Sequence, residues 1–496
     1  MCGWILTITI LLIIYDDLFI KSKMKIKTNF IYSSILTVSN FIFPFMTFPY
    51  ISRVLGVSNV GIYNWVGGII QYFILFSMMG IAIVGIREVA KNKSNPAELS
   101  NTFSSLLVLT VVTTIISLVV LFVLMAFVPK FAEYRVMFYI GAANVFVNLF
   151  LVEWFFKGIE NFKYITIRSI IVKSLYVISV FVFIRHADDY VTYYLLTVAA
   201  VVLNALFNWI YCRKFVHFTF KNINLKPFIK PFMILGIYLL FNSMYSTFNV
   251  AYLGFVGGNV EVGYYSTATK LYGILLAFFS AFTGVMLPRM SALVAENNFS
   301  EINRLIGKSF DILYTFCFPM IIFFMFFAPE IVRIIAGPGY EGAILPMRIV
   351  LPLMLIIGTE EILIIQLLMP LNKDKAIFIN SVIGAFVGVA LAIVLVKDLH
   401  SVGSAIVWVC SELSILISAS FFVKKYVGIR IPYKMVLIKF LYAIPYILIC
   451  YLAINLLSDS IIKLAVAGVA CLIYFLIEDM YISKNNTIRS LLPKWR

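Results

Sequence analysis

Two stretches of the chain, GVSNVGIYNW at residues 56–65 and GNVEVGYYST at residues 258–267, decide the fold because they are copies of one another. They align without a gap at an offset of 202 residues, so that Gly61 falls on Gly263. Matches between apolar residues are common by chance, and the weight therefore lies on the Gly, Asn and Arg pairs. Beyond the two copies, the alignment pairs Asn40 with Asn242 and Arg87 with Arg289. The chain contains an internal repeat.

The composition around the repeat is that of a membrane protein. Of the 496 residues, 62% are hydrophobic and only 12% are charged, and the mean hydropathy is +1.01. Soluble domains carry about 25% charged residues. A helix needs about 20 apolar residues to cross a bilayer, so this chain has room for more than a dozen crossings. A water-soluble enzyme, a disordered protein and a secreted disulfide-rich domain are excluded.

Apolar runs between polar breaks predict an all-α polytopic membrane protein with fourteen transmembrane helices. We expect these helices at residues 29–51, 62–86, 102–128, 136–157, 165–185, 190–211, 231–255, 262–287, 308–335, 344–370, 377–396, 401–423, 438–457 and 460–482. If successive connections alternate between the two sides, most of the 39 Lys and Arg residues fall on the side of both termini. The positive-inside rule identifies this side as the cytoplasm. Basic loops then account for the net charge of +16, and no nucleic-acid partner is expected.

The repeat divides the chain into two predicted lobes. Six helices separate the copies, and an even number returns the chain to the same side, so the copies run parallel about an axis along the membrane normal. We expect a six-helix lobe at 24–225, a second at 226–425, and two extra helices with a cytoplasmic tail at 426–496. A central cleft between the lobes is the favoured interpretation, and a bundle without a functional cleft is the alternative. The apolar stretch in residues 1–23 is too short to span, which predicts a non-native extension before Met24.

Lys270 is a charged residue that we expect deep in the membrane, about nine residues into the predicted helix 262–287. An ionisable group at this depth is costly and marks a functional site by default. One interpretation is a cationic anchor for a substrate that carries phosphate, which a flexible ammonium can bind and release. The other is an ion pair with a neighbouring acid.

Three asparagines are candidates for contact with a sugar. Asn40 and Asn242 occupy equivalent points of the first helix in each copy, and Asn249 shares the helix of Asn242. An amide inside the membrane hydrogen-bonds either to a bound molecule or to another helix. Both interpretations are open at this point.

Three arginines stand at predicted helix ends. Arg53 follows the helix at 29–51 on the outer side, and Arg87 and Arg289 end two helices at the cytoplasmic face. Long basic side chains commonly extend from a helix end to the membrane surface. The functional alternative is that Arg53 lines the mouth of the cleft, and that Arg87 and Arg289 form a gate that first meets an anionic headgroup.

Glu360 and Glu361 lie in the middle of the predicted helix 344–370. They are candidates for coupling to a cation or a proton. A structural role beside Arg348 or Lys270 is the alternative.

Motifs for catalysis, metal binding and cofactor binding are missing from the sequence. The six cysteines form no C-x-x-C pair, and the three histidines lack metal-ligand spacing. No Ser/His/Asp arrangement or phosphate-binding loop is present. We therefore predict a membrane transporter without catalytic residues, metal or cofactor, and not an enzyme.

Several segments carry a resemblance to a known family. These are ISRVLGVSNVGIYNW and GIAIVGIREVAKNK at 51–65 and 80–93, and VEVGYYSTATKLYG and VMLPRMSALV at 260–273 and 285–294. With the R-x-L-G-x-x-x-x-G-x-Y signature from Arg53 to Tyr63, they resemble the polysaccharide transporter family. This is the Wzx-type flippase branch of the MOP exporter superfamily, and the likeness covers residues 24–482.

The resemblance implies the MATE-like fold, with two six-helix lobes and alternating access. It implies transfer of undecaprenyl-diphosphate-linked oligosaccharides across the bacterial inner membrane, for O-antigen, capsular or exopolysaccharide biosynthesis. The implied partners are this lipid-linked glycan, membrane lipids, a polysaccharide polymerase and a chain-length regulator. The resemblance implies Lys270 as the first candidate for contact with the headgroup, and Arg53, Arg87 and Arg289 as secondary candidates. Two alternatives are a MATE-type drug exporter, which favours acidic cavity residues, and a membrane glycan polymerase or glycosyltransferase, which needs a sizeable outer loop.

Overall fold

The computed structural model of the protein describes residues 24–478 apart from 220–222, 245–246 and 430. Within these ranges the chain is helical nearly throughout, with no strand. The predicted extension at 1–23 lies outside the described residues, as does the tail from residue 479.

The described residues of the first half, from Met24 on, form eight α-helices and one short 3-10 helix. They are α2 (Met24–Met78), α3 (Ile81–Asn92), α4 (Pro96–Phe127), α5 (Pro129–Glu133), α6 (Arg135–Asn148), α7 (Glu153–Gly158), α8 (Phe162–Phe183), η1 (Ala187–Asp189) and α9 (Tyr190–Cys212). Local sequence sets several of their ends. For example, Oδ1 of Asn95 accepts hydrogen bonds from the N–H groups of Ala97 and Glu98, and Pro96 opens α4. This is the usual start of a helix, because the side chain satisfies N–H groups that have no partner within the helix.

The second half contains the remaining elements. They are α10 (Lys226–Ser243), α11 (Thr247–Val256), α12 (Gly258–Ala295), α13 (Phe299–Phe326), α14 (Ala328–Ile335), η2 (Glu341–Ala343), α15 (Ile344–Val350), α16 (Leu353–Leu363), the π-helical η3 (Ile364–Leu368), α17 (Asp374–Val427), α18 (Tyr433–Leu456) and α19 (Ser460–Ile477).

Within the described residues, every one of the fourteen predicted ranges falls on one or more of these helices. Among the same residues, ten helical segments are long and apolar enough to cross a membrane, or eleven if α10 and α11, bent by 51°, form one span. Two of the ten, Ile31–Asn92 and Asp374–Val427, contain 62 and 54 residues. At about 1.5 Å per residue each exceeds twice the roughly 30 Å of a hydrocarbon core. Both are broken where connections were expected, at Gly56 and His400. The exact number of fourteen crossings stays a prediction.

The repeat predicted from the sequence is visible in the backbone. Gly56 and Gly258, which are equivalent, both have positive φ, at 73° and 83°. Glycine adopts this conformation without the strain that other residues incur. In both copies the chain bends at this glycine and enters the long helix that carries Gly61 or Gly263.

The two copies pack directly on each other through these later glycines. A Cβ on Gly61 would lie 1.7 Å from the carbonyl oxygen of Asn259, and a Cβ on Gly263 would lie 2.3 Å from that of Val57. Val57 and Asn259 are themselves equivalent in the repeat. The contact is therefore reciprocal, as a pseudo-two-fold axis between α2 and α12 requires. Small residues allow such close approach of helix backbones in membranes.

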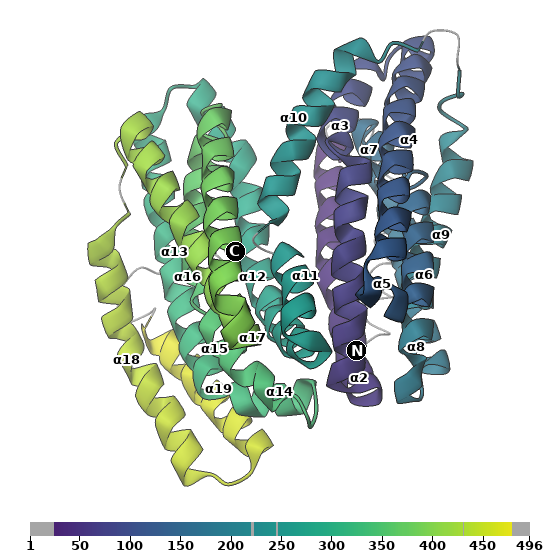
Figure 1. Ribbon diagram of the computed structural model, residues 1–496. Coiled ribbons are helices and arrows are strands. Elements are labelled where there is room, and N and C mark those ends of the chain that lie inside the picture. Colours follow the sequence, from purple (N-terminus) through teal and green to yellow (C-terminus); the bar gives the residue numbers. More distant parts are fainter. Residues whose placement is uncertain (1–23, 220–222, 245–246, 430, 479–496) are drawn as a thin grey trace.

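Figure 1 shows two bundles side by side, with α2 to α9 in one and α12 to α17 in the other. α11 packs against both α2 and α17, and α10 packs against α2, α3 and α17. Because α10 contacts both bundles, the predicted lobe boundary at 225/226 stays a prediction. We call the end of the molecule with Arg53 and α14 the Arg53 end, and the opposite end, with Arg87 and Arg289, the Arg87 end.

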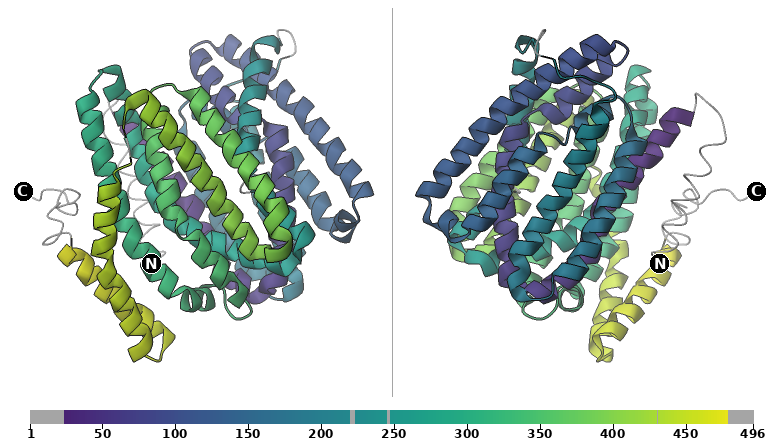
Figure 2. Two further views of the ribbon diagram at one scale, coloured as in Figure 1. Left: turned by 60° about the vertical axis from the view of Figure 1, so that its left-hand side comes forward. Right: turned by 90° about the vertical axis from the view of Figure 1, so that its right-hand side faces the viewer.

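The two helices outside the repeat, α18 and α19, lie at the periphery (Figure 2). α18 packs against α13, where Nζ of Lys439 is 3.0 Å from Oδ1 of Asp311 and both side chains are mostly buried. The Tyr446 hydroxyl of α18 donates to Glu478, just beyond α19, at 2.8 Å. The pair is thus fixed to the second bundle.

Candidate functional site

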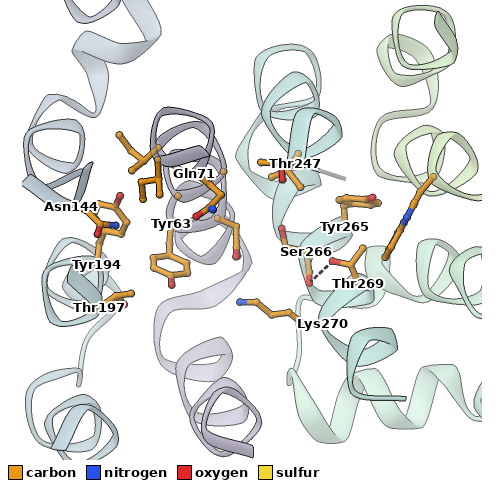
Figure 3. A pocket seen from close by; sticks show the side chains of 17 residues that line it. Tyr63, Gln71, Asn144, Tyr194, Thr197, Thr247, Tyr265, Ser266, Thr269 and Lys270 are labelled. Atoms are coloured by element: carbon orange, nitrogen blue, oxygen red, sulfur yellow. Dashed lines mark hydrogen bonds between the residues drawn. The ribbon is translucent and has the colours of Figure 1, made fainter. Parts of the chain in front are cut away.

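A cavity of about 480 Å³ lies between the two bundles, directly beyond the contact of Gly61 with α12. α2 lines it with residues between 63 and 74, and α12 with residues between 265 and 270. Further lining side chains come from α6, α9, α11 and α17. Figure 3 shows the walls facing each other. In α2 and α12 the lining residues come after Gly61 and Gly263 in the chain. The contact between these two glycines therefore closes the cavity toward the Arg53 end.

The two main walls are equivalent in the repeat but differ in chemistry. Tyr63 and Tyr265 occupy equivalent positions, and both line the cavity. Gly68 and Lys270 are also equivalent, and both line it as well. The positive charge of the cavity therefore comes from one copy, at a position where the other copy has no side chain.

Lys270 extends from α12 toward α2 (Figure 3). Its ammonium nitrogen lies 5.0 Å from the ring centre of Phe48 and 5.7 Å from that of Tyr63. Ring faces attract cations but leave the N–H groups free to donate. Among the described residues Lys270 has no hydrogen-bond or ion-pair partner. The alternative of an ion pair with a neighbouring acid therefore finds no partner in the described part of the chain.

The wall formed by α2, α6 and α9 carries neutral polar groups. Gln71 is exposed on α2, and Asn144 of α6 and Thr197 of α9 join it. Tyr194 of α9 also lines the cavity, is 3% exposed, and has a hydroxyl without a hydrogen-bond partner in the described residues. Leaving a buried hydroxyl unsatisfied costs about 1–3 kcal/mol. This group is therefore a candidate for contact with a bound molecule.

These neutral residues are absent from the predicted site. For α2 the sequence holds a usable signal, because Asn64, Gly67, Gly68 and Gln71 follow the i, i+3, i+4, i+7 spacing of one helix face. For α6 and α9 it holds none. Single amides and hydroxyls in apolar helices look the same whether they face a cavity or another helix.

Asn249 stands behind the cavity wall. It is 1% exposed, and its amide donates to the carbonyl oxygen of Ser404 at 2.6 Å and to the hydroxyl of Tyr265 at 3.3 Å. Since Tyr265 lines the cavity, Asn249 holds a lining ring in place and joins α11, α12 and α17. The described geometry thus favours the interpretation of a bond between helices.

Asn40 and Asn242 are both exposed and are not among the residues that line the cavity. Oδ1 of Asn40 accepts a hydrogen bond from Nζ of Lys173 at 2.6 Å, and the same ammonium donates to Ser39 at 2.8 Å. Asn40 therefore joins α2 to α8. The structure does not bring these two asparagines together with Lys270.

Arg53 joins the two bundles at the Arg53 end. Its guanidinium donates to the carbonyl oxygen of Ile334 at the end of α14, and to that of Pro49 at 2.9 Å. Beside it, the hydroxyl of Tyr340 donates to the carbonyl oxygen of Ser52 at 3.1 Å. Carbonyl groups at the end of a helix have no partner within it and attract cations. Arg53 lies outside the cavity lining and helps to close the molecule at this end.

A second contact of the same kind involves Lys130 of α5. Its ammonium donates to the carbonyl oxygen of Gly254 near the end of α11, and lies 4.6 Å from the ring centre of Trp65. Trp65 is fully buried and donates to the carbonyl oxygen of Ala251 at 3.1 Å. Two cations of the first bundle thus bind backbone carbonyls outside it, Arg53 on α14 and Lys130 on α11, and neither was predicted to do so.

Arg87 and Arg289 are exposed at the opposite end. Nε of Arg87 donates to the neighbouring Glu88 at 2.8 Å. Neither arginine lines the cavity. Their position agrees with both interpretations from the sequence, a surface anchor or a first contact for an anion.

Glu360 and Glu361 lie behind the α12 wall and are not among the lining residues. Glu360 lies beside Glu412 of α17, and Glu361 accepts from the hydroxyl of Thr283 at 2.9 Å. Glu412 also accepts from the indole N–H of Trp408, a cavity-lining residue, at 3.0 Å. Arg348 donates instead to the carbonyl oxygen of Met325. Within the described residues no group of three acids, histidines or cysteines is arranged to hold a metal ion.

Two curated relatives resemble the chain over most of its length. Both carry the name "Putative O-antigen transporter" and are 24% identical to it. The relative from Escherichia coli strain K12 aligns over 399 residues, which is 79% of this chain and 95% of the relative. The relative from Shigella dysenteriae aligns over 403 residues, which is 79% of this chain and 98% of the relative.

Solved structures share the fold. Lipid II flippase MurJ, in an inward closed conformation, superposes with a TM-score of 0.75 at 14% identity, over 90% of this chain and 99% of MurJ. A MATE family multidrug transporter of the MOP superfamily, in an inward-facing conformation, superposes with a TM-score of 0.59 at 13% identity. The superposition covers 77% of this chain and 97% of the transporter. The expected all-α MATE-like membrane fold is confirmed.

The family itself follows from a match to a described protein family. Residues 26–294 match the family described as "Polysaccharide biosynthesis protein". This range is more than half of the chain and contains both copies of the repeat, the Gly61–Gly263 contact and Lys270. As expected from the sequence, the proteins named here are transporters and not enzymes. The chain belongs to the polysaccharide biosynthesis protein family.

Proposed function

We propose that the chain is a flippase that moves undecaprenyl-diphosphate-linked oligosaccharide repeat units across the bacterial inner membrane. The product serves O-antigen, capsular or exopolysaccharide biosynthesis, where a polymerase and a chain-length regulator receive it. One observation carries the proposal: the ammonium of Lys270, without an acidic partner in the described residues, stands in a cavity with hydroxyl and amide lining groups between the two copies of the repeat.

The cavity offers what an anionic headgroup needs. A diphosphate–glycan cannot cross about 30 Å of hydrocarbon unaided, because its charges and hydroxyls would lose their hydration. Hydroxyl and amide groups of the lining replace that hydration, and Lys270 supplies a positive charge. The polyprenyl tail stays in lipid, so the cavity needs to accept the polar head alone.

The contacts at the Arg53 end support alternating access. With both termini in the cytoplasm, this end faces the periplasm, and the structure is closed there by the Gly61–Gly263 contact and by Arg53 and Lys130. The two cations bind backbone carbonyls rather than carboxylates. Such hydrogen bonds can be exchanged for water without leaving an acid unpaired. We propose that they open when the headgroup is released.

The other predicted residues take outlying roles in this proposal. Arg87 and Arg289 provide the first contact for the headgroup at the cytoplasmic surface, and Asn40 and Asn242 meet it on its way along the first helix of each copy. Asn249 acts through Tyr265. Glu360 and Glu361, with Glu412, couple the cycle to a proton or cation through Trp408.

A MATE-type drug exporter is the competing proposal. Export of cationic drugs calls for acids in the cavity, but in the described lining the charged residue is Lys270. A glycan polymerase would need a large outer domain, and the described connections between helices are short. The flippase therefore accounts for more of the observations.

The test is deletion of the gene in its own host, followed by analysis of lipid-linked repeat units. We expect repeat units to accumulate on the cytoplasmic leaflet and surface glycan to disappear. The wild-type gene should restore both, and Lys270→Ala should not. Normal surface glycan in the deletion strain, with no second transporter present, would contradict the flippase. Full rescue by Lys270→Ala would contradict the role of Lys270 alone.

A further inference from the structure

We propose that the cavity is built for a headgroup whose sugars carry no charge, with the diphosphate on the α12 wall and the sugars on the wall of α2, α6 and α9. This inference rests on the proposed function and specifies its substrate. It follows from the unequal chemistry of the two walls.

The charge in the cavity is too small for a second anionic group. Among the described lining residues Lys270 is the charged side chain, and it brings one positive charge. A diphosphate already carries more negative charge than one ammonium neutralises. A carboxylate on a sugar would enter with no counter-charge, and burying an unpaired charge is costly. Uronic acids in the first sugars of the headgroup are therefore disfavoured.

Acidic groups lie behind the α12 wall. Trp408 lines the cavity and donates to Glu412, and Glu360 lies beside Glu412. The groups closest to the wall on this side are thus acids. They add no positive potential that a second anion could use, and any ionised member of the group repels it.

The wall of α2, α6 and α9 carries neutral groups that suit a sugar. Gln71 and Asn144 can both donate and accept, and the hydroxyl of Tyr194 is buried without a partner among the described residues. Such groups match the hydroxyls of a neutral sugar, and the rings of Tyr63 and Tyr194 can pack against its C–H faces. Figure 3 shows Asn144, Tyr194 and Thr197 gathered on one side of the cavity, across from Lys270.

Tyr63 connects the two subsites. Its ring lies 5.7 Å from the ammonium of Lys270, and its ring centre lies 4.6 Å from that of Tyr193 and 5.8 Å from that of Tyr194, both on α9. A phosphate bound to Lys270 therefore sits beside Tyr63, and the first sugar continues toward α6 and α9. The order of the two subsites matches the order of diphosphate and sugar in the cargo.

The experiment compares two ligands that differ in one group. The full-length protein in lipid nanodiscs is titrated with undecaprenyl diphosphate that carries a disaccharide, ending either in a hexose or in the corresponding hexuronic acid. We expect the hexose ligand to bind at least about tenfold more tightly, a difference of roughly 1.4 kcal/mol. Equal or tighter binding of the hexuronic acid would overturn this inference and leave the flippase proposal in place. Binding of neither ligand would overturn both.

Two variants probe the neutral wall. Gln71→Lys adds a second cation and should improve binding of the hexuronic acid several-fold, whereas Gln71→Met, of similar length and without charge, should not. Tyr194→Phe should weaken binding of the hexose ligand several-fold and leave binding of undecaprenyl diphosphate without sugar unchanged. Equal effects of Tyr194→Phe on both ligands, or equal effects of the two Gln71 variants, would overturn the assignment of sugars to this wall.

Discussion

The helix faces of α2 and α12 show where two copies of one sequence stayed alike and where they diverged. At the crossing, Gly61 meets α12 and Gly263 meets α2, and each glycine is needed because the other helix lies against it. One to two turns further on, the same helices face a cavity, and Gly68 corresponds to Lys270. The glycines at the crossing are identical in the two copies, and so are Tyr63 and Tyr265 in the cavity, whereas Gly68 and Lys270 differ. We propose that the symmetric glycine contact closes the molecule and that the unequal pair in the cavity selects the substrate.

The largest effect is expected from breaking the symmetric glycine contact. In Gly61→Leu the new Cβ would lie 1.7 Å from the carbonyl oxygen of Asn259, so the helices must separate. Overpacking costs about 1–3 kcal/mol and sometimes more, and 3 kcal/mol is roughly a hundredfold in an equilibrium. We expect transport to be lost and the melting temperature in detergent to fall.

The matched control for this variant is Gly307→Leu on α13, outside the cavity lining. A Cβ at Gly307 meets no atom within 4 Å, and we expect transport close to that of the wild type. Equal loss in both variants would mean that the helices tolerate no larger side chain at either glycine, and would contradict the special role of the crossing.

A second, smaller effect is expected from moving the charge between the copies. Lys270→Gly should lower transport about tenfold or more, because the headgroup then enters a neutral cavity. Adding Gly68→Lys to this variant returns a cation to the cavity from the opposite wall. We expect partial recovery, limited by Val250, whose side chain would lie 3.3 Å from the new Cβ. A complementation assay that reports surface glycan measures transport by the single and the double variant. No recovery in the double variant would contradict the view that transport requires a positive charge in the cavity.

The smallest effect is expected at the Arg53 end. Arg53→Gln removes the hydrogen bonds from the guanidinium to Ile334 and Pro49. Hydrogen bonds from charged groups contribute about 1.5–3 kcal/mol when buried, and Arg53 is exposed, so we expect a shift of a few-fold toward an open Arg53 end.

Spin labels at the exposed positions Ser58 and Glu341 would report this opening as a change in their distance distribution. Arg87→Gln, at the opposite end, is the control and should leave the distribution unchanged. If the two variants behave alike, Arg53 does not hold this end closed.

The fold was predictable because its signals are local. Apolar runs of sufficient length mark helices, and the copies at 56–65 and 258–267 are visible without any contact information. The equivalent bends at Gly56 and Gly258 and the reciprocal contact of Gly61 and Gly263 follow from that repeat.

The site was predictable only in part, because facing residues come from helices far apart in the chain. Lys270 was identifiable alone, since a charge at membrane depth is exceptional. Tyr194 and Asn144 were not, since the rotation of α9 and α6 about their axes decides whether a polar group meets the cavity or a neighbour. Asn249 lies behind the wall, and Arg53 contacts Ile334. Neither position was predictable, because the prediction of spans does not give the rotation of a helix about its axis.

The central claim is that an anionic lipid headgroup changes leaflet by way of Lys270. The most direct measurement is transfer of an undecaprenyl-diphosphate-linked glycan in vesicles that contain the purified protein, scored by lectin access to the far leaflet, for the wild type, Lys270→Arg and Lys270→Gln. The account predicts transfer by the wild type and by Lys270→Arg, and at least about a tenfold loss in Lys270→Gln. Equal transfer by all three proteins would contradict it.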